Sequence, residues 1–139
     1  MENYLKQIQL SNNMKTALLV FGNEFLKEDN FAIKISKEIK LPNTEIIRCY
    51  SVGDMFKIQG YDKVFILDVV KNIKEVTLIT DLDKIKDKKI FSMHDFDLGF
   101  NLKLLKEVNQ INDINIIGIP QQGDKESIKK EIKEIVEKV

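Results

Sequence analysis

Three short stretches of this chain are apolar at almost every position. They are "KTALLVF" at residues 15–21, "KVFILDVV" at residues 63–70 and "INIIGI" at residues 114–119. A strand with one face in water alternates apolar and polar side chains, whereas a strand that is covered on both faces is apolar throughout. The three stretches therefore predict buried strands in a sheet that is covered by helices on both sides.

Amphipathic helices are expected between and after these strands. In "NFAIKISKEIK", Phe31, Ile35 and Ile39 recur every four residues with charged side chains between them. This spacing is typical of a helix with one buried face. Pro42 is expected to stop the helix, because the residue before a proline is pushed away from helical angles.

Strands and helices alternate along the rest of the chain. The final helix is expected over residues 124–139, with Asp124 or Ser127 as its cap. The remaining candidates are strands at residues 44–50, 75–80 and 88–93, a short helix or loop at residues 51–62, and a helix at residues 97–109. The alternation predicts an α/β fold, a three-layer sandwich of the phosphorylase/hydrolase-like kind, with a mostly parallel or mixed sheet of about five to six strands.

Length and charge limit the domain organisation and the partners. The 139 residues are enough for one domain with a real core. Residues 14–139 are expected to form this domain, and residues 1–13, which are polar and lack periodicity, to form a loose N-terminal extension. The 22 basic residues balance the 22 acidic ones, so neither nucleic acid nor a membrane is expected as a partner.

The sequence features that report on the cellular compartment favour the cytoplasm. No apolar run approaches the roughly 20 residues that span a bilayer, and no segment has the pattern of a signal peptide. The single cysteine, Cys49, cannot form an internal disulfide. Cys49 is expected to be a small strand residue, because no second thiol or histidine nearby in the sequence suggests an activated nucleophile.

Three titratable residues are expected at one edge of the sheet, because ligands of open α/β sheets collect beyond the carboxyl ends of the strands. Asp29 follows the first strand, Asp68 lies near the end of the strand at residues 63–70, and His94 follows residues 88–93. Two carboxylates and an imidazole could bind a divalent cation and support metal-assisted hydrolysis. A structural explanation is also open, because acids after strands often cap helices and a lone histidine is often only a hydrogen-bonded surface residue.

Several segments resemble the motifs of one family. "LLVFGNEFLKEDNFAIKI" resembles the amino-terminal motif of the nickel-iron hydrogenase maturation endopeptidases, in which an apolar strand leads into Gly-Asn and an acidic pair before a helix. "VFILDVV" is similar to the second block of the family, and "FSMHDFDLGFNLKLL" to the third. "INIIGIPQ" and the final helix occupy the closing positions, so the resemblance spans residues 15–139.

The resemblance implies an α/β fold and a hydrolase, classed with aspartyl-type peptidases, that acts on the large-subunit precursor of a hydrogenase. Such an enzyme removes the C-terminal extension of the precursor once nickel has been inserted, so nickel would arrive with the substrate. The metal-contacting and catalytic positions of the family fall on Asp29, Asp68 and His94. Glu28 is expected to support the loop or the helix start instead. The positions expected to contact the substrate are Gly22, Asn23 and Gly53.

The chain departs from the family pattern at two positions beside the first motif. Val20 stands at a position where the family usually has glycine. Asn30, directly after the acidic pair, stands at a second such position. Because asparagine tolerates left-handed backbone angles, Asn30 is expected to take over the role of that glycine. Arg48, the sole arginine, is expected to lie at a strand edge, with binding of a precursor carboxylate as the alternative.

Two other functions remain open from the sequence. The first is a module on the same fold that binds the precursor or nickel without cutting, which the departures at Val20 and Asn30 would allow. The second is a nucleotide-binding domain in which "FGNEF" acts as a phosphate loop. The second is weaker, because phosphate loops usually carry several glycines or a lysine, and nearby acids would repel the anion.

Overall fold

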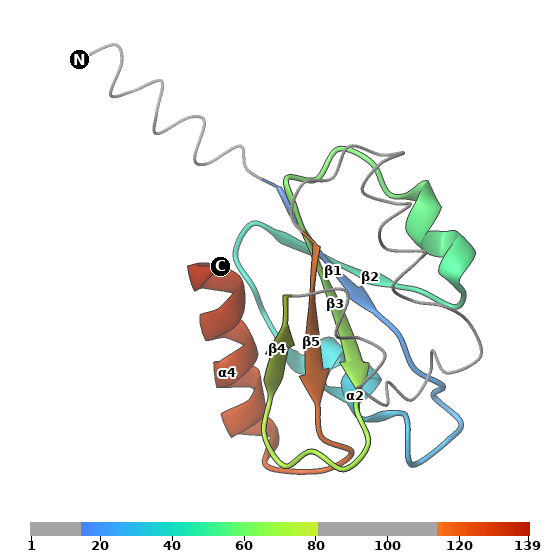
Figure 1. Ribbon diagram of the computed structural model, residues 1–139, viewed down its shortest axis with the longest axis vertical. Helices are drawn as coiled ribbons and strands as arrows, with labels where there is room; N and C mark the ends of the chain where they lie inside the picture. Colours follow the sequence, from blue (N-terminus) through green and yellow to red (C-terminus); the bar gives the residue numbers. More distant parts are fainter. Residues whose placement is uncertain (1–14, 81–113) are drawn as a thin grey trace.

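The computed structural model describes residues 15–80 and 114–139, and residues 1–14 and 81–113 lie outside this description. The described elements follow the order expected from the sequence, as Figure 1 shows. The strands are β1 (Thr16–Val20), β2 (Thr44–Arg48), β3 (Lys63–Val69), β4 (Thr77–Ile79) and β5 (Ile114–Ile119). The helices are α2 (Phe31–Glu38), the 3-10 helix η1 (Val52–Lys57) and α4 (Lys125–Lys138).

The five strands form one mixed sheet in the order β2-β1-β3-β5-β4. The pairs formed by β1 with β2, β1 with β3, and β3 with β5 are parallel, whereas β4 runs antiparallel to β5. This arrangement confirms the predicted α/β fold and gives the direction of the segment at residues 75–80, which the sequence left open. The predicted strand at residues 88–93 and the helix at residues 97–109 lie outside the described residues.

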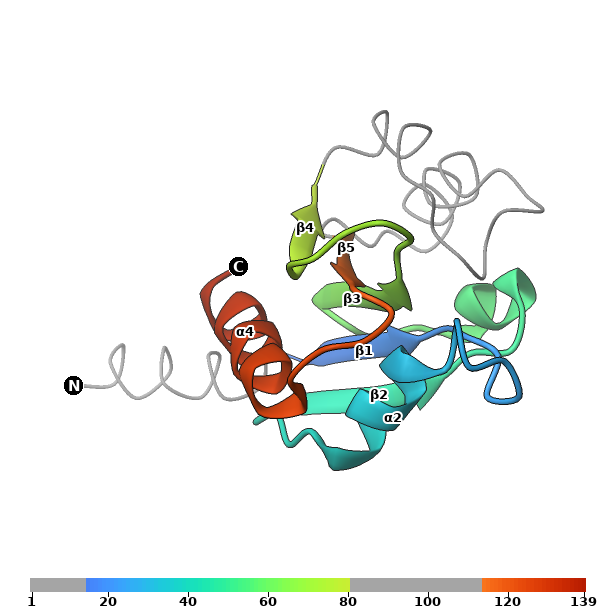
Figure 2. The same cartoon turned by 90° about the horizontal axis from the view of Figure 1, so that it is seen from below.

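One face of the sheet is covered by α2 and α4, and η1 lies on the other side (Figure 2). In α4 the buried residues Ile128, Ile132 and Val136 recur every four positions, as the sequence predicted. Asp124 is the N-cap residue of α4, so the first of the two expected caps is confirmed in position. No helix among the described residues is long and apolar enough to cross a membrane.

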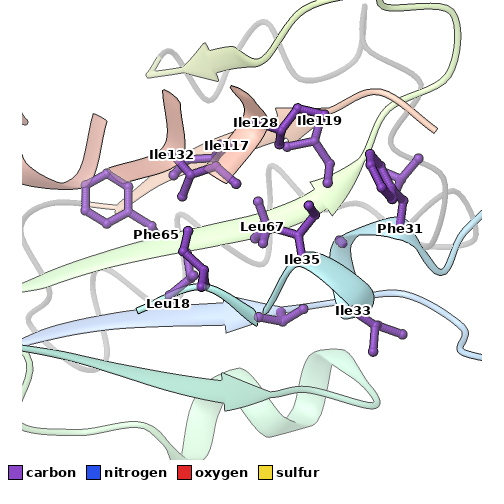
Figure 3. Close-up of a cluster of buried hydrophobic side chains, with 14 of the residues drawn as sticks. Leu18, Phe31, Ile33, Ile35, Phe65, Leu67, Ile117, Ile119, Ile128 and Ile132 are labelled. Atoms are coloured by element: carbon purple, nitrogen blue, oxygen red, sulfur yellow. The ribbon is translucent and has the colours of Figure 1, made fainter. Parts of the chain in front are cut away.

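The side chains of the central strands alternate between two apolar clusters, so both faces of the sheet are buried. In β3, Phe65 and Leu67 pack on the side of α2 and α4, while Ile66 belongs to the cluster on the side of η1. Figure 3 shows the first cluster, in which Ile35 of α2 and Ile132 of α4 lie over the strands. The unbroken apolar runs in the sequence have this two-sided burial as their physical cause.

Candidate active site at the carboxyl ends of β1 and β3

After β1 the chain first adds β2 on one side of β1 and then adds β3 on the other side, so the strand order reverses at β1. The loops that leave the carboxyl ends of β1 and β3 therefore diverge, and ligands of open α/β sheets bind at such a point. The backbone N–H of Phe21 donates to the carbonyl oxygen of Leu67 at 3.0 Å, which ties the two strand ends together. Asp29 follows β1 and Asp68 lies within the end of β3, so both predicted carboxylates belong to this edge.

The loop after β1 is folded around the carboxylate of Asp29. Asp29 is 2% exposed, and its Oδ2 accepts a hydrogen bond from the backbone N–H of Asn23 at 2.8 Å. The Asn23 side chain accepts from the N–H of Phe25 at 3.0 Å, and the Asn23 carbonyl accepts from the N–H of Leu26 at 3.1 Å. The N–H of Asp29 in turn donates to the Leu26 carbonyl at 3.0 Å. The predicted residues Asn23 and Asp29 are thus in direct contact.

Gly22 is required where the loop begins, for two separate reasons. Its φ angle is +144°, a conformation that side chains of L-residues rarely adopt. A Cβ atom at this position would also lie 2.7 Å from the backbone oxygen of Asp29. The absence of a side chain at Gly22 therefore lets the loop return close to β1 and bring Asp29 back to the sheet edge.

Asp68 is fully buried on the side of the sheet that η1 covers. Its neighbours in β3, Leu67 and Val69, pack on the opposite side with α2 and α4, so the alternation of the strand sets this direction. Oδ1 of Asp68 accepts a hydrogen bond from the N–H of Val69 at 2.8 Å. Burying a carboxylate costs free energy unless it is hydrogen-bonded or paired. Apolar packing alone therefore does not explain why two carboxylates are buried at one edge of the sheet.

His94, the third predicted ligand, lies outside the described residues. Among residues 15–80 and 114–139, no group of three or more histidine, cysteine, aspartate or glutamate side chains is placed to hold a metal ion. The three-residue site that combines Asp29, Asp68 and His94 therefore stays a prediction. The donor set fits a cation in chemical type, because carboxylate oxygens and an imidazole nitrogen are common ligands of divalent metals.

Arg48 holds the start of the loop in place from the neighbouring strand. Its Nη1 donates to the carbonyl oxygens of Val20 at 3.0 Å and Cys49 at 2.8 Å, and its Nη2 donates to that of Gly22 at 2.5 Å. Its guanidinium carbon also lies 4.7 Å from the ring centroid of Tyr50. The predicted position at a strand edge is confirmed. The role as a clamp on three backbone carbonyls was not foreseen, although the presence of a single arginine in the chain was a signal.

Gly53, the remaining predicted substrate contact, lies in η1. A Cβ atom there would be 3.5 Å from Oγ of Ser51, an ordinary contact, so the backbone does not require glycine at this position. The neighbouring Asp54 closes a capping box, and its Oδ2 accepts from the N–H groups of Tyr50 at 2.7 Å and Ser51 at 3.1 Å. The pattern Ser-x-x-Asp at residues 51–54 was an available signal for this cap that the sequence reasoning missed. The role of Gly53 in substrate binding stays a prediction.

The structure changes the interpretation of the two departures from the family pattern. Asn30 has a φ of −95° and a ψ of −1°, which is right-handed, so the expectation that it adopts left-handed angles is wrong. As the N-cap residue of α2 it needs no such conformation. Val20 is a fully buried residue of β1, in register with Arg48 and Leu67. Its side chain contributes to the cluster beneath α2 and α4, and the strand around it is regular.

Cys49 is buried directly after β2 and does not have the character of a nucleophile. Its side chain is 1% exposed. Burial raises the pKa of the thiol to about 11, the nearby carboxylate of Asp54 adds to this, and the guanidinium of Arg48 acts in the opposite direction. The thiol is therefore protonated at neutral pH, as expected for a structural cysteine.

The raised pKa of Cys49 predicts a pH-dependent stability. Between about pH 9, where the thiol of the unfolded chain titrates, and about pH 11, the folded state retains a proton that the unfolded state has lost. The contribution of Cys49 to the free energy of unfolding is therefore present below pH 9 and is lost as the pH rises to 11. In urea titrations over this range, the wild type should lose more stability than Cys49→Ala. Parallel pH profiles for the two proteins would contradict this assignment.

A sequence profile of the family described as HycI, hydrogenase maturation protease, matches residues 50–139. No curated protein sequence gives a significant match. The matched range contains β3 with Asp68 and the predicted position of His94, while Asp29 precedes it.

Several solved structures share the fold. The endopeptidase HycI from Escherichia coli has a TM-score of 0.65 and 20% sequence identity, with 87% of this chain and 88% of that chain covered. A hydrogenase 3 maturation protease has a TM-score of 0.67 and 18% identity, with 88% and 89% covered. The [NiFe] hydrogenase maturation protease HybD from Thermococcus kodakarensis has a TM-score of 0.65 and 23% identity, with 90% and 98% covered. At these identities the likeness shows that the fold is shared.

Proposed function

The chain belongs to the hydrogenase maturation protease family, and we propose that it is an endopeptidase that removes the C-terminal extension of a nickel-loaded hydrogenase large-subunit precursor. The observation that carries this proposal is the pair of buried carboxylates, Asp29 and Asp68, at the edge where the strand order reverses. A protease needs groups that recognise the substrate and assist the attack of water, and these two are at the position where α/β enzymes bind their ligands.

The nickel ion is part of the substrate in this proposal. Asp29, Asp68 and His94 contact the nickel site of the precursor, so that a precursor without the metal lacks the feature that they recognise. The scissile carbonyl lies beside them and is polarised by the cation. Water adds to the carbonyl carbon while one of the three side chains accepts its proton, the C–N bond breaks, and the leaving amine takes up a proton.

Exposed apolar side chains near the same edge support a protein as the substrate. The large apolar side chains that are exposed within the described part of the chain are Phe25, Leu26 and Tyr50, at 87%, 43% and 77%. All three lie in the loops that leave β1 and β2. Exposed aromatic residues beside a site are typical of surfaces that bind another protein.

The contacts of the first loop count against the phosphate-loop alternative. A phosphate cradle needs backbone N–H groups that point at the anion. Here the N–H of Asn23 donates to the carboxylate of Asp29, and those of Phe25 and Leu26 donate to Asn23. A carboxylate of the chain thus takes the place that a phosphate would need.

The direct test compares nickel-loaded and nickel-free precursor as substrates of the purified protein. We expect mass spectrometry to show loss of a C-terminal peptide from the nickel-loaded precursor, and at least about tenfold slower loss from the nickel-free form, because the latter lacks the ion that the carboxylates bind. Binding of the loaded precursor without any change in its mass would instead support the non-catalytic module.

A further inference from the structure

A pocket of about 640 Å³ opens beside the candidate active site, between the loops that follow β1, β3 and β5. Its volume lies within the usual range for ligand-binding sites. Glu28, which lines the pocket, is the direct neighbour of Asp29, and the segment 72–74 in its wall follows the strand that carries Asp68. The pocket is therefore formed by the same loops that leave the carboxyl ends of β1 and β3.

The pocket is basic, although the chain as a whole has no net charge. Its charged lining consists of one glutamate, Glu28, and four lysines, which are Lys27, Lys34, Lys74 and Lys125. Lys125 is paired with the carboxylate of Glu38 at 3.1 Å. The other three lysines are exposed and form no ion pair with another described residue. Three lysine charges at one concave surface are thus available to a negatively charged ligand.

Two helices begin at the same pocket. α2 starts at Phe31 and α4 at Lys125, and both residues line the pocket. The N-terminal ends of helices carry partial positive charge, which adds to the charge of the lysines. Gln121 connects the loop after β5 to the loop after β1, because its Nε2 donates to the backbone oxygen of Glu28 at 3.2 Å. The pocket is thus shaped by contacts between loops that are distant in the sequence.

The uncharged lining favours a peptide over a small anion. Asn72 and Gln122 bring side-chain amides to the pocket, and Phe31 and Ile73 bring apolar surface. Amides can donate to and accept from a peptide backbone, while apolar surface would gain nothing from an inorganic ion. The basic residues are lysines, which act as separate point charges on flexible stems and suit several carboxylates spaced along a chain.

We propose that this pocket binds an acidic peptide segment in the C-terminal extension of the precursor. The inference rests on the proposed function, and it adds a class of sequence that the enzyme selects. Carboxylates of the extension bind Lys27, Lys34 and Lys74, and this holds the extension at the carboxyl-terminal edge of the sheet, to which Asp29 and Asp68 belong. Cleavage then releases the anchored segment as the product.

The first experiment measures binding without requiring cleavage. Fluorescence anisotropy follows a labelled glutamate-rich peptide and its glutamine counterpart, at low salt, with the wild type and with Lys34→Glu/Lys74→Glu. We expect the wild type to prefer the glutamate peptide and the double variant to bind it at least about tenfold more weakly. The matched control, Lys40→Glu/Lys130→Glu, makes the same charge change at exposed residues outside the pocket and should bind like the wild type. Equal binding of both peptides by the wild type would overturn the proposal.

The second experiment measures cleavage of the nickel-loaded precursor by the same three proteins. The pocket variant should raise KM by about tenfold with little change in kcat, because it removes binding that does not change during the reaction. An unchanged KM would overturn the proposal that this pocket binds the extension, while leaving the proposed function intact. If the wild type does not cut the precursor at all, the proposed function fails, and the peptide titration still decides whether the pocket binds acidic segments.

Discussion

Asp68→Asn is expected to lower kcat/KM for cleavage of the nickel-loaded precursor by at least about 100-fold, because the loss of a group that supports a metal ligand already costs about 10 to 100-fold and Asp68 is proposed to contact the ion itself. The substitution changes one oxygen to an amide nitrogen and removes the negative charge. The fold should remain, since the oxygen that accepts from the N–H of Val69 is preserved in asparagine. We expect the free energy of unfolding to change by less than about 1 kcal/mol.

The control for this variant is the same chemical change at the opposite edge of the sheet. Asp62 precedes β3, and its Oδ2 accepts from the backbone N–H of Lys15 at 2.8 Å. Asp62→Asn should cleave the precursor at the wild-type rate. Mass spectrometry of the product and urea denaturation of each variant separate an effect on catalysis from an effect on folding. Full cleavage by Asp68→Asn would remove Asp68 from the proposed site.

The second large effect is expected for Gly22→Ala, which should lower the free energy of unfolding by about 2 to 4 kcal/mol and also impair cleavage. The new methyl group would meet the backbone oxygen of Asp29 at 2.7 Å, and the φ of +144° is strained for alanine. The loop must move away from β1 to relieve this contact, and Asp29 moves with it. Loss of activity should therefore persist at temperatures where the variant is still folded.

Gly60→Ala distinguishes the two causes of the Gly22 effect. Gly60 also has a positive φ, +84°, but a Cβ atom there would meet nothing within 4 Å. The free energy of unfolding of this variant should fall by only about 1 to 2 kcal/mol, because only the backbone is strained, and the variant should cleave normally. Equal losses of stability for the two variants would show that the contact with Asp29 is not important. Thermal unfolding monitored by circular dichroism provides the comparison.

The order of the described strands and helices could be predicted from the sequence because burial leaves a direct pattern there. Two-sided burial makes a strand continuously apolar, and one-sided burial makes a helix apolar every three to four residues. The direction of β4 could not be predicted, because its three residues carry no pattern that distinguishes parallel from antiparallel pairing. For Asn30, the tolerance of asparagine for left-handed angles was a weak guide, since the start of α2 required right-handed ones.

The candidate site was predictable in part. Strand ends identify an edge of the sheet, and Asp29 and Asp68 do lie there. The lysine pocket was not predictable, because its charged residues come from two loops and two helices that the sequence separates by up to 98 positions, from Lys27 to Lys125. Local periodicity contains no information about contacts at such separations. The clamp made by Arg48 was hidden for the same reason, since two of its three acceptors, the carbonyls of Val20 and Gly22, lie in another strand and loop.

The clamp formed by Arg48 has a consequence for what could replace this residue. Its planar guanidinium binds three carbonyl oxygens through two nitrogens, whereas the ammonium group of a lysine has a single nitrogen on a flexible stem. A lysine at position 48 would keep the positive charge but would not hold the carbonyls of Val20 and Gly22 together. The base of the loop therefore depends on the shape of this side chain, and preserving the charge alone would not preserve the loop.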